Sequence, residues 1–366
     1  KHSRQELSDA FDRMKAMLHI SGDATSATVS LSVPREHLAE ALKLVAEVLR
    51  EPSFPASELS TLVKEQTTDI DSQRQEPQTK AMDFIGQTFN AYPAGHPLAY
   101  RSLEVRQKDL LAARPEDLKA FHDAFYGASH ATFAASGDFD PAQVQTLVDQ
   151  LFGSWTSPQP YAHVASRLKA VAGQSQMIET PDKQMALFLA VERWPMKDTD
   201  ADYPAFLMAN QILGGAPLRN RIASRLRQKE GFSYGAGSAF RASSEDPVAL
   251  WQAFAIYAPQ NAAKLDAAFK DELHKALADG FTTDELAFAK ESWLTAETSQ
   301  RQTDRAIAGW LGNSLHLNRP IRFEGELEQK VKALTLDQVN AALRKYLDPA
   351  KLVIVKAGDF AKAAKQ

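Results

Sequence analysis

The alternation of apolar and polar residues predicts a strand followed by an amphipathic helix at two places in the chain. In TVSLSVPREHLAEALKLVAEVL, apolar residues alternate before Pro34 and recur three and four positions apart after it. The stretch QAFAIYAPQNAAKLDAAFKDEL repeats this pattern around Pro259. Proline suits such a junction because its fixed φ fits a first helical turn, where its missing N–H would have had no partner. Each stretch is therefore expected to form a strand, a turn at proline and a helix.

A second pair of similar stretches follows in the same order. PSFPASELSTLVKEQ matches DGFTTDELAFAKESW, with Glu58 and Glu285 at equivalent positions. Ser57 in the first stretch, and Thr282 or Thr283 in the second, are the expected N-caps of long helices.

A third pair closes each copy. ARPEDLKAFHDAFYGASHATFAASGDFDPA and LTLDQVNAALRKYLDPAKLVIVKAGDFAKA both show a helix, a turn, an apolar run and then Gly-Asp-Phe. The offset between copies is 225 residues at the two prolines and 221 at Gly137 and Gly358. Three ordered matches at nearly constant offset predict an internal duplication.

The predicted fold class is α+β, with two homologous units that each have an antiparallel sheet and helices packed on one face. The strand candidates ATVSLSV, ATFAAS and ALFLAVE alternate, and the helices between them have ten or more residues. We expect a first unit over 1–155, a linker over 156–175 and a second unit over 176–366. The second unit has 83 residues before its proline and the first only 33, so roughly 50 residues are expected upstream of Lys1.

Composition narrows the classes of partner. The 366 residues include 44% hydrophobic and 24% charged residues, and the net charge is -4, so neither a nucleic-acid partner nor membrane insertion is expected. The chain has no cysteine, which excludes disulfides, thiolate metal sites and cysteine nucleophiles.

Histidine spacing excludes the common helical zinc motifs. No two of the nine histidines are four residues apart, so neither H-E-x-x-H nor H-x-x-E-H occurs. His122 and His130 are expected to be solvated rather than to share a metal. We therefore predict no catalytic and no metal-binding residue in this chain.

The stretch LGGAPLRNRIASRLRQKEGFSYGAGSAF, residues 213–240, combines arginines, glycines and one tyrosine. Arginine offers a rigid fork of donors for carboxylates and carbonyls, and Tyr234 adds an aromatic face with one hydroxyl. Gly231, Gly235 and Gly237 would let a strand or a peptide ligand approach the backbone. A basic helix face followed by an ordinary strand fits the same residues, so both interpretations stay open at this point.

The segment RLRQKEGFSY resembles the R-x-x-x-G-x-x-Y sequence of the pitrilysin/insulinase family of metallopeptidases, also called inverzincins. SFPASEL, HPLAYRSLE, FYGASHATFAASGDFD and the closing AGDF are also similar to this family, and the resemblance spans nearly the whole chain. It implies a processing-peptidase-like fold in which Arg227 and Tyr234, in the half that lacks zinc, hold the peptide substrate.

The resemblance also implies where the zinc site lies. In active members H-x-x-E-H and a distal glutamate bind zinc in the other half, and the motif helix would fall before Lys1. Asp69 lies near the distal-glutamate position, and DYPAFLMANQIL, at the equivalent helix of the second unit, has no histidine. Both departures count against zinc binding by this chain.

We therefore expect the substrate-binding, non-catalytic half of a periplasmic or secreted zinc endopeptidase. Its partners would be a zinc-bearing catalytic half and a peptide substrate. A non-enzymatic scaffold of the same fold is the alternative, and an independent hydrolase with an unrecognised site is a third hypothesis.

Overall fold

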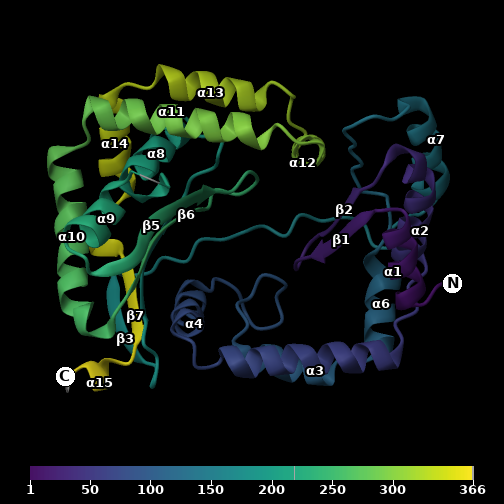
Figure 1. Cartoon of the computed structure of the whole chain (residues 1–366), viewed down its shortest axis with the longest axis horizontal. Coiled ribbons are helices and arrows are strands. Elements are labelled where there is room, and N and C mark those ends of the chain that lie inside the picture. The colour runs from purple at the N-terminus through teal and green to yellow at the C-terminus, as the bar shows by residue number, and fades with distance from the viewer. Residues whose placement is uncertain (218, 365–366) are drawn as a thin grey trace. The chain divides into compact units, whose positions relative to one another are not determined.

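In the computed structural model, which describes residues 1–217 and 219–364, the chain forms two compact units (Figure 1). Unit 1 comprises residues 1–67, 108–164 and 300–321. Unit 2 comprises residues 68–107, 165–299 and 322–366. The chain passes from unit 1 to unit 2 after Val164, inside the expected linker, but both units also take segments from beyond it.

Unit 1 is mainly helical, with one antiparallel pair of strands. Its elements are α1 (Arg4–Arg13), β1 (Met17–Gly22), β2 (Ala27–Ser32), η1 (Arg35–His37), α2 (Leu38–Arg50), α6 (Pro115–Phe125), α7 (Pro141–Phe152) and α12 (Asp304–His316). Helices α3 (Ala56–Gln73) and α5 (Leu103–Ala112) cross the unit boundaries. A small core forms where α1 and α2 pack on the strand pair, around Phe11, Met14 and Val45.

The predicted strand ATFAAS in unit 1 is wrong. Residues 131–136 do not join β1 and β2, and they lie along α12 instead. The Thr132 hydroxyl donates to the Gly312 carbonyl at 3.5 Å, and the Ser136 hydroxyl donates to Asp304 at 2.9 Å. Alternating residues form a strand only where another strand offers a backbone ladder, and α12 offers side chains and carbonyls.

His122 also differs from its expected place in solvent. Its side chain is only 12% exposed, and its Nε2 lies 2.7 Å from the Leu49 carbonyl oxygen, which can only accept. His130 stacks on Tyr161 with ring centroids 3.8 Å apart. Each imidazole therefore has its own structural contact.

Unit 2 contains a five-stranded sheet in the order β3-β7-β4-β6-β5. The strands are β3 (Gln174–Glu179), β4 (Ala186–Trp194), β5 (Ser233–Ala242), β6 (Ala249–Tyr257) and β7 (Val353–Gly358). All neighbours are antiparallel except β3 and β7, which are parallel. The predicted α+β class is confirmed, and the parallel pair corrects the expectation of a purely antiparallel sheet.

The helices of unit 2 pack on both faces of this sheet, most of them on one face. They are α4 (Pro77–Phe89), α8 (Tyr203–Asn210), η2 (Gln211–Gly215), α9 (Arg221–Ala223), η3 (Ser224–Lys229), η4 (Pro259–Asn261), α10 (Ala262–Asp279), α11 (Thr283–Gln300), α13 (Phe323–Ala333), α14 (Leu336–Tyr346), η5 (Pro349–Lys351) and α15 (Phe360–Ala363). Figure 1 shows α4 on one side of the sheet and α8, α10 and α14 on the other.

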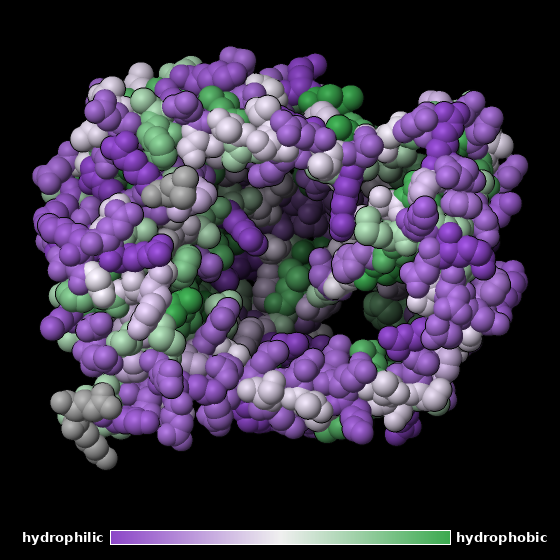
Figure 2. All heavy atoms as spheres, viewed as in Figure 1, coloured by the Kyte–Doolittle hydropathy of each residue, from purple (hydrophilic) through white to green (hydrophobic). Residues whose placement is uncertain are grey.

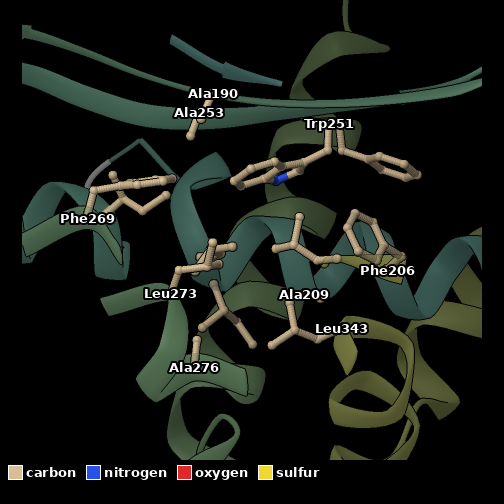
Figure 3. Close-up of a cluster of buried hydrophobic side chains, with 14 of the residues drawn as sticks. Ala190, Phe206, Ala209, Trp251, Ala253, Phe269, Leu273, Ala276 and Leu343 are labelled. Carbon is tan, nitrogen blue, oxygen red and sulfur yellow. The ribbon is translucent and has the colours of Figure 1, made fainter. Parts of the chain in front are cut away.

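The large core of unit 2 lies under the helix-covered face. Trp251 of β6 is fully buried and lies between the sheet and side chains of three helices, among them Phe206, Leu273 and Leu343 (Figure 3). Aromatic side chains of this size dominate the burial of apolar surface. The core therefore fixes β5 and β6 firmly on α8 and α10.

Helix α4 explains why residues 68–107 join unit 2. Its Ala81, Ile85 and Phe89 pack against Leu189 and Val355 of the central strands. A parallel β3–β7 pair with apolar residues on both faces needs such a second cover. Unit 2 therefore includes residues from before the predicted linker.

Helix starts follow the predicted capping in one copy only. Thr282 caps α11, because its hydroxyl accepts from the Glu285 N–H at 3.3 Å and its own N–H donates to the Glu285 carboxylate at 2.8 Å. Ser57 is not an N-cap, since α3 already begins at Ala56. No helix among the described residues is long and apolar enough to cross a membrane.

One buried carboxylate makes unit 2 sensitive to pH. Glu192 of β4 is 4% exposed, and burial raises the pKa of its carboxyl to about 7, although the backbone N–H of Asp348 donates to it at 3.0 Å. The folded state therefore binds this proton more tightly than the unfolded state. The stabilisation is complete below the unfolded pKa of about 4.5 and is lost as pH rises through about 7.

Replacing Glu192 by glutamine is expected to raise the free energy of unfolding by about 1–3 kcal/mol above pH ~7.5 and to change it little below pH ~4.5. Urea denaturation of the whole chain across this pH range measures the effect. Glu291→Gln, which changes an exposed carboxylate of α11, is the control. If the free energy of unfolding depended on pH in the same way in both variants, the assignment of this pH dependence to the buried Glu192 carboxyl would be wrong.

Candidate functional site

The stretch singled out in the sequence forms a helical connection with two π-helical segments. Helix α8 continues into η2, and α9 continues into η3, both with π geometry. Asn220 caps α9, since its Oδ1 accepts from the Ala223 N–H at 2.7 Å. π-Helical turns are rare and are concentrated at functional sites. This connection is therefore a candidate site on geometry alone.

Two of the four arginines in this connection form ion pairs within the protein. Arg221 donates through Nε and Nη2 to both oxygens of Glu285, at 2.6 and 2.8 Å, and also to the Gly280 carbonyl. Burial opposes ionisation of Glu285, but the hydrogen bonds from Arg221 and Thr282 hold the pKa of its carboxyl below its usual value. Arg225 lies 3.2 Å from both Glu230 and Asp271. These contacts tie α9 and η3 to α10 and α11.

The other two arginines are exposed and differ in their surroundings. The guanidinium of Arg219 lies over the ring of Phe288, 5.4 Å from its centroid. Arg227 makes no hydrogen bond, ion pair or ring contact with any described residue. The sequence did not distinguish these arginines, and the fold leaves Arg227 with five donors for an outside group.

Tyr234 lies on β5 at a β-bulge. The register with β6 shifts between Ser233, which faces Tyr257, and Gly235, which faces Ile256. Bulges re-aim a side chain and occur often beside functional sites. The Tyr234 side chain is 66% exposed, and its hydroxyl has no partner in the described part of the chain.

A tight reversal connects the two residues. Gly231 has a φ of 65°, in the left-handed region, and the Phe232 N–H donates to the Leu226 carbonyl at 2.9 Å. The Leu226 side chain is fully buried in the core. Arg227 and Tyr234 therefore stand on either side of an anchored turn, and no contact joins their side chains.

The remaining glycines have separate roles. A Cβ built on Gly237 would lie 2.9 Å from the Gly214 carbonyl oxygen, so its bare backbone is needed for the close approach of η2. A Cβ built on Gly235 would meet nothing within 4 Å. Gly237 therefore permits close backbone packing, whereas the space over Gly235 is open.

The sheet face beside Tyr234 is uncovered. Phe254 and Ile256 alternate along β6 and are 37% and 41% exposed, whereas Ala255 and Tyr257 between and after them are fully buried. Gly235 lies opposite Ile256 in the register. The sequence does not show that these two apolar residues are exposed, because the pattern of QAFAIYA does not tell which face of the strand is covered.

A separate cavity of about 480 Å³ lies on the helix side of the same connection, between η3, α10 and α11. Its lining includes Arg221, Arg225 and Lys229, but neither Arg227 nor Tyr234. Arg221, Arg225 and Glu285 in this lining form ion pairs within the protein.

No three His, Cys, Asp or Glu side chains gather as possible metal ligands anywhere in the described ranges. The residues present therefore do not fit a zinc ion, and no metal-dependent step is assigned to this chain.

One family model matches part of this chain. Residues 112–292 match a family model described as the peptidase M16 inactive domain. No curated protein matches the chain. A solved peptidase M16 inactive domain from Pseudomonas fluorescens superposes with a TM-score of 0.81 at 26% identity, covering 98% of this chain and 84% of that one.

Two further structures share the fold at lower identity. A protease from Helicobacter pylori has a TM-score of 0.76 at 16% identity, covering 96% of this chain and 84% of its own. The periplasmic protease PqqL from Escherichia coli has a TM-score of 0.74 at 15% identity, covering 96% of this chain but only 38% of its own.

Proposed function

Since this chain carries a peptidase M16 inactive domain over residues 112–292, we propose that it is the non-catalytic, substrate-binding half of a zinc-dependent metalloendopeptidase. A catalytic half, fused or separate, would hold the zinc and cleave the peptide. This chain would hold the peptide backbone through Arg227 and Tyr234.

The observation that carries the proposal is the free state of both side chains. Arg227 and Tyr234 are exposed beside an uncovered sheet face, while Arg221 and Arg225 of the same connection are tied down by carboxylates. A guanidinium and a phenol without internal partners can donate to the carbonyl oxygens of an extended peptide. The backbone that carries Arg227, in η3, is held by the buried Leu226, and the backbone that carries Tyr234, in β5, is held by the sheet.

Arg227→Ala and Tyr234→Phe are each expected to lower kcat/KM for peptide cleavage about tenfold to a hundredfold, when the chain is combined with its zinc-bearing half. The range corresponds to about 1–3 kcal/mol for a hydrogen bond to a peptide carbonyl. Lys229→Ala is the matched control, since Lys229 is exposed on the same π-helical turn but lines the cavity on the helix side.

An unchanged kcat/KM in both variants would contradict the proposed role of Arg227 and Tyr234 in substrate binding. A chain that stably binds its partner, while no variant at these positions affects proteolysis, would favour a non-enzymatic scaffold. We also propose a periplasmic or secreted location, which the similarity to a periplasmic protease supports. Recovery of the native protein in the cytosolic fraction alone would contradict that location.

A further inference from the structure

The uncovered face of the sheet in unit 2 is small and lies at its β5 edge. Helix α4 covers the part formed by β4 and β7, through Ile85 and Phe89. Beyond it, Phe254, Ile256 and Tyr234 remain exposed at 37%, 41% and 66%. Together they expose roughly 300 Å² of apolar and aromatic surface, taking about 200 Å² for each side chain.

The area indicates which kind of occupant this face can take. A stable interface between two protein copies buries about 800 Å² on each partner, well above what these three side chains expose. One or two side chains of an extended peptide, by contrast, would cover such an area. Groups of hydrophobic residues on the visible surface are likewise small and separated by hydrophilic ones (Figure 2).

Gly235 sets the shape of this face. It lies opposite Ile256 and next to Tyr234, and the direction in which its side chain would point is empty to 4 Å. The ring of Phe254 lies over the neighbouring glycine of the strand, with Cε1 3.4 Å from a Cβ built on Gly237. The empty space therefore lies on the same face of the sheet as the Ile256 side chain and the Phe254 ring.

Resting on the proposed function, we infer that the space over Gly235 is a specificity subsite for one apolar side chain of the bound peptide. A peptide whose backbone meets Arg227 and Tyr234 would place a side chain over Gly235, against Phe254 and Ile256. Burial of an apolar side chain there would favour peptides with Leu, Phe or Met at one position over peptides with Ser.

Gly235→Val tests the subsite by filling it. A Cβ built on Gly235 meets no atom within 4 Å, and a β-branched residue suits a strand, so the fold is expected to remain intact. Binding is measured by fluorescence anisotropy with two short labelled peptides that differ only by Leu or Ser at their central position. The unaltered chain is expected to bind the Leu peptide about tenfold to a hundredfold more tightly.

In Gly235→Val, this preference is expected to fall to within about threefold, with the Ser peptide bound as before. Arg227→Ala should weaken both peptides equally, because it acts on the backbone. Gly325→Ala, which adds a Cβ in open space on α13, is the control and should change neither affinity.

The outcomes separate the two proposals. Equal binding of both peptides, still weakened by Arg227→Ala, would overturn the subsite and leave the substrate-binding role standing. Binding of both peptides that Arg227→Ala does not weaken would overturn the role of Arg227. A chain that binds neither peptide would overturn both.

Discussion

Replacing Asn210 by leucine is expected to lower the free energy of unfolding by about 2–5 kcal/mol. Asn210 is 4% exposed, and its Oδ1 accepts from the Ser238 hydroxyl at 2.7 Å and from Trp251 Nε1 at 3.0 Å. Leucine has a similar size but no acceptor, so two buried donors would lose their partner. Each such loss costs about 1–3 kcal/mol.

Urea denaturation of the whole chain, followed by circular dichroism, measures this effect. Ser238→Ala is the control, because it removes one donor and leaves the bond from Trp251, and it should cost only about 1 kcal/mol. The double variant should recover part of the loss, since one unsatisfied donor is then absent. A cost below about 1 kcal/mol for Asn210→Leu would contradict this account of the network.

Replacing Gly214 by alanine is expected to cost about 2–4 kcal/mol and to weaken peptide binding as well. A Cβ on Gly214 would lie 2.4 Å from Ser238 Oγ and 2.5 Å from the Ser238 backbone nitrogen. The backbone of β5 cannot rotate away as a flexible side chain can, so η2 or the strand must shift. Since Tyr234 stands on that strand, its position would shift too.

Gly235→Ala is the matched control for stability alone, on the same strand and with nothing within 4 Å of the added Cβ. It should leave stability within about 0.5 kcal/mol of the starting value. Equal free energies of unfolding for the two variants in urea denaturation would show that the close approach of η2 to β5 does not require glycine at position 214. A destabilised Gly214→Ala variant that still binds peptide normally would show that Tyr234 is insensitive to this contact.

Three buried positions fix the elements that carry the candidate site. Asn210 holds β5 and β6 through hydrogen bonds, Gly214 lets η2 approach β5, and Leu226 buries the turn that follows Arg227. Side chains that contact a ligand act best from elements fixed in this way. The stability of the core and the placement of Arg227 and Tyr234 are therefore expected to change together.

The sequence by itself determined the features that depend on neighbouring residues. Its apolar spacing after Pro34 and Pro259 predicted helices that the structure has as α2 and α10, each after a short turn. It also predicted an N-cap at Thr282 or Thr283, of which Thr282 caps α11, and the positive φ of Gly231 is of the kind that glycine permits. Helix periodicity, capping and glycine turns are local, because the interacting groups lie within a few residues of one another.

Only the tertiary structure decided the features that require a partner from far along the chain. Residues 131–136 alternate like a strand but lie on α12, and β3 pairs in parallel with β7, which follows it by more than 170 residues. The same holds for the site. Arg221 and Arg227 are alike in the sequence, yet Glu285 binds one and nothing described binds the other. A hydrogen bond or a cover of apolar surface depends on which atoms the fold brings within reach, and no local pattern records that distance.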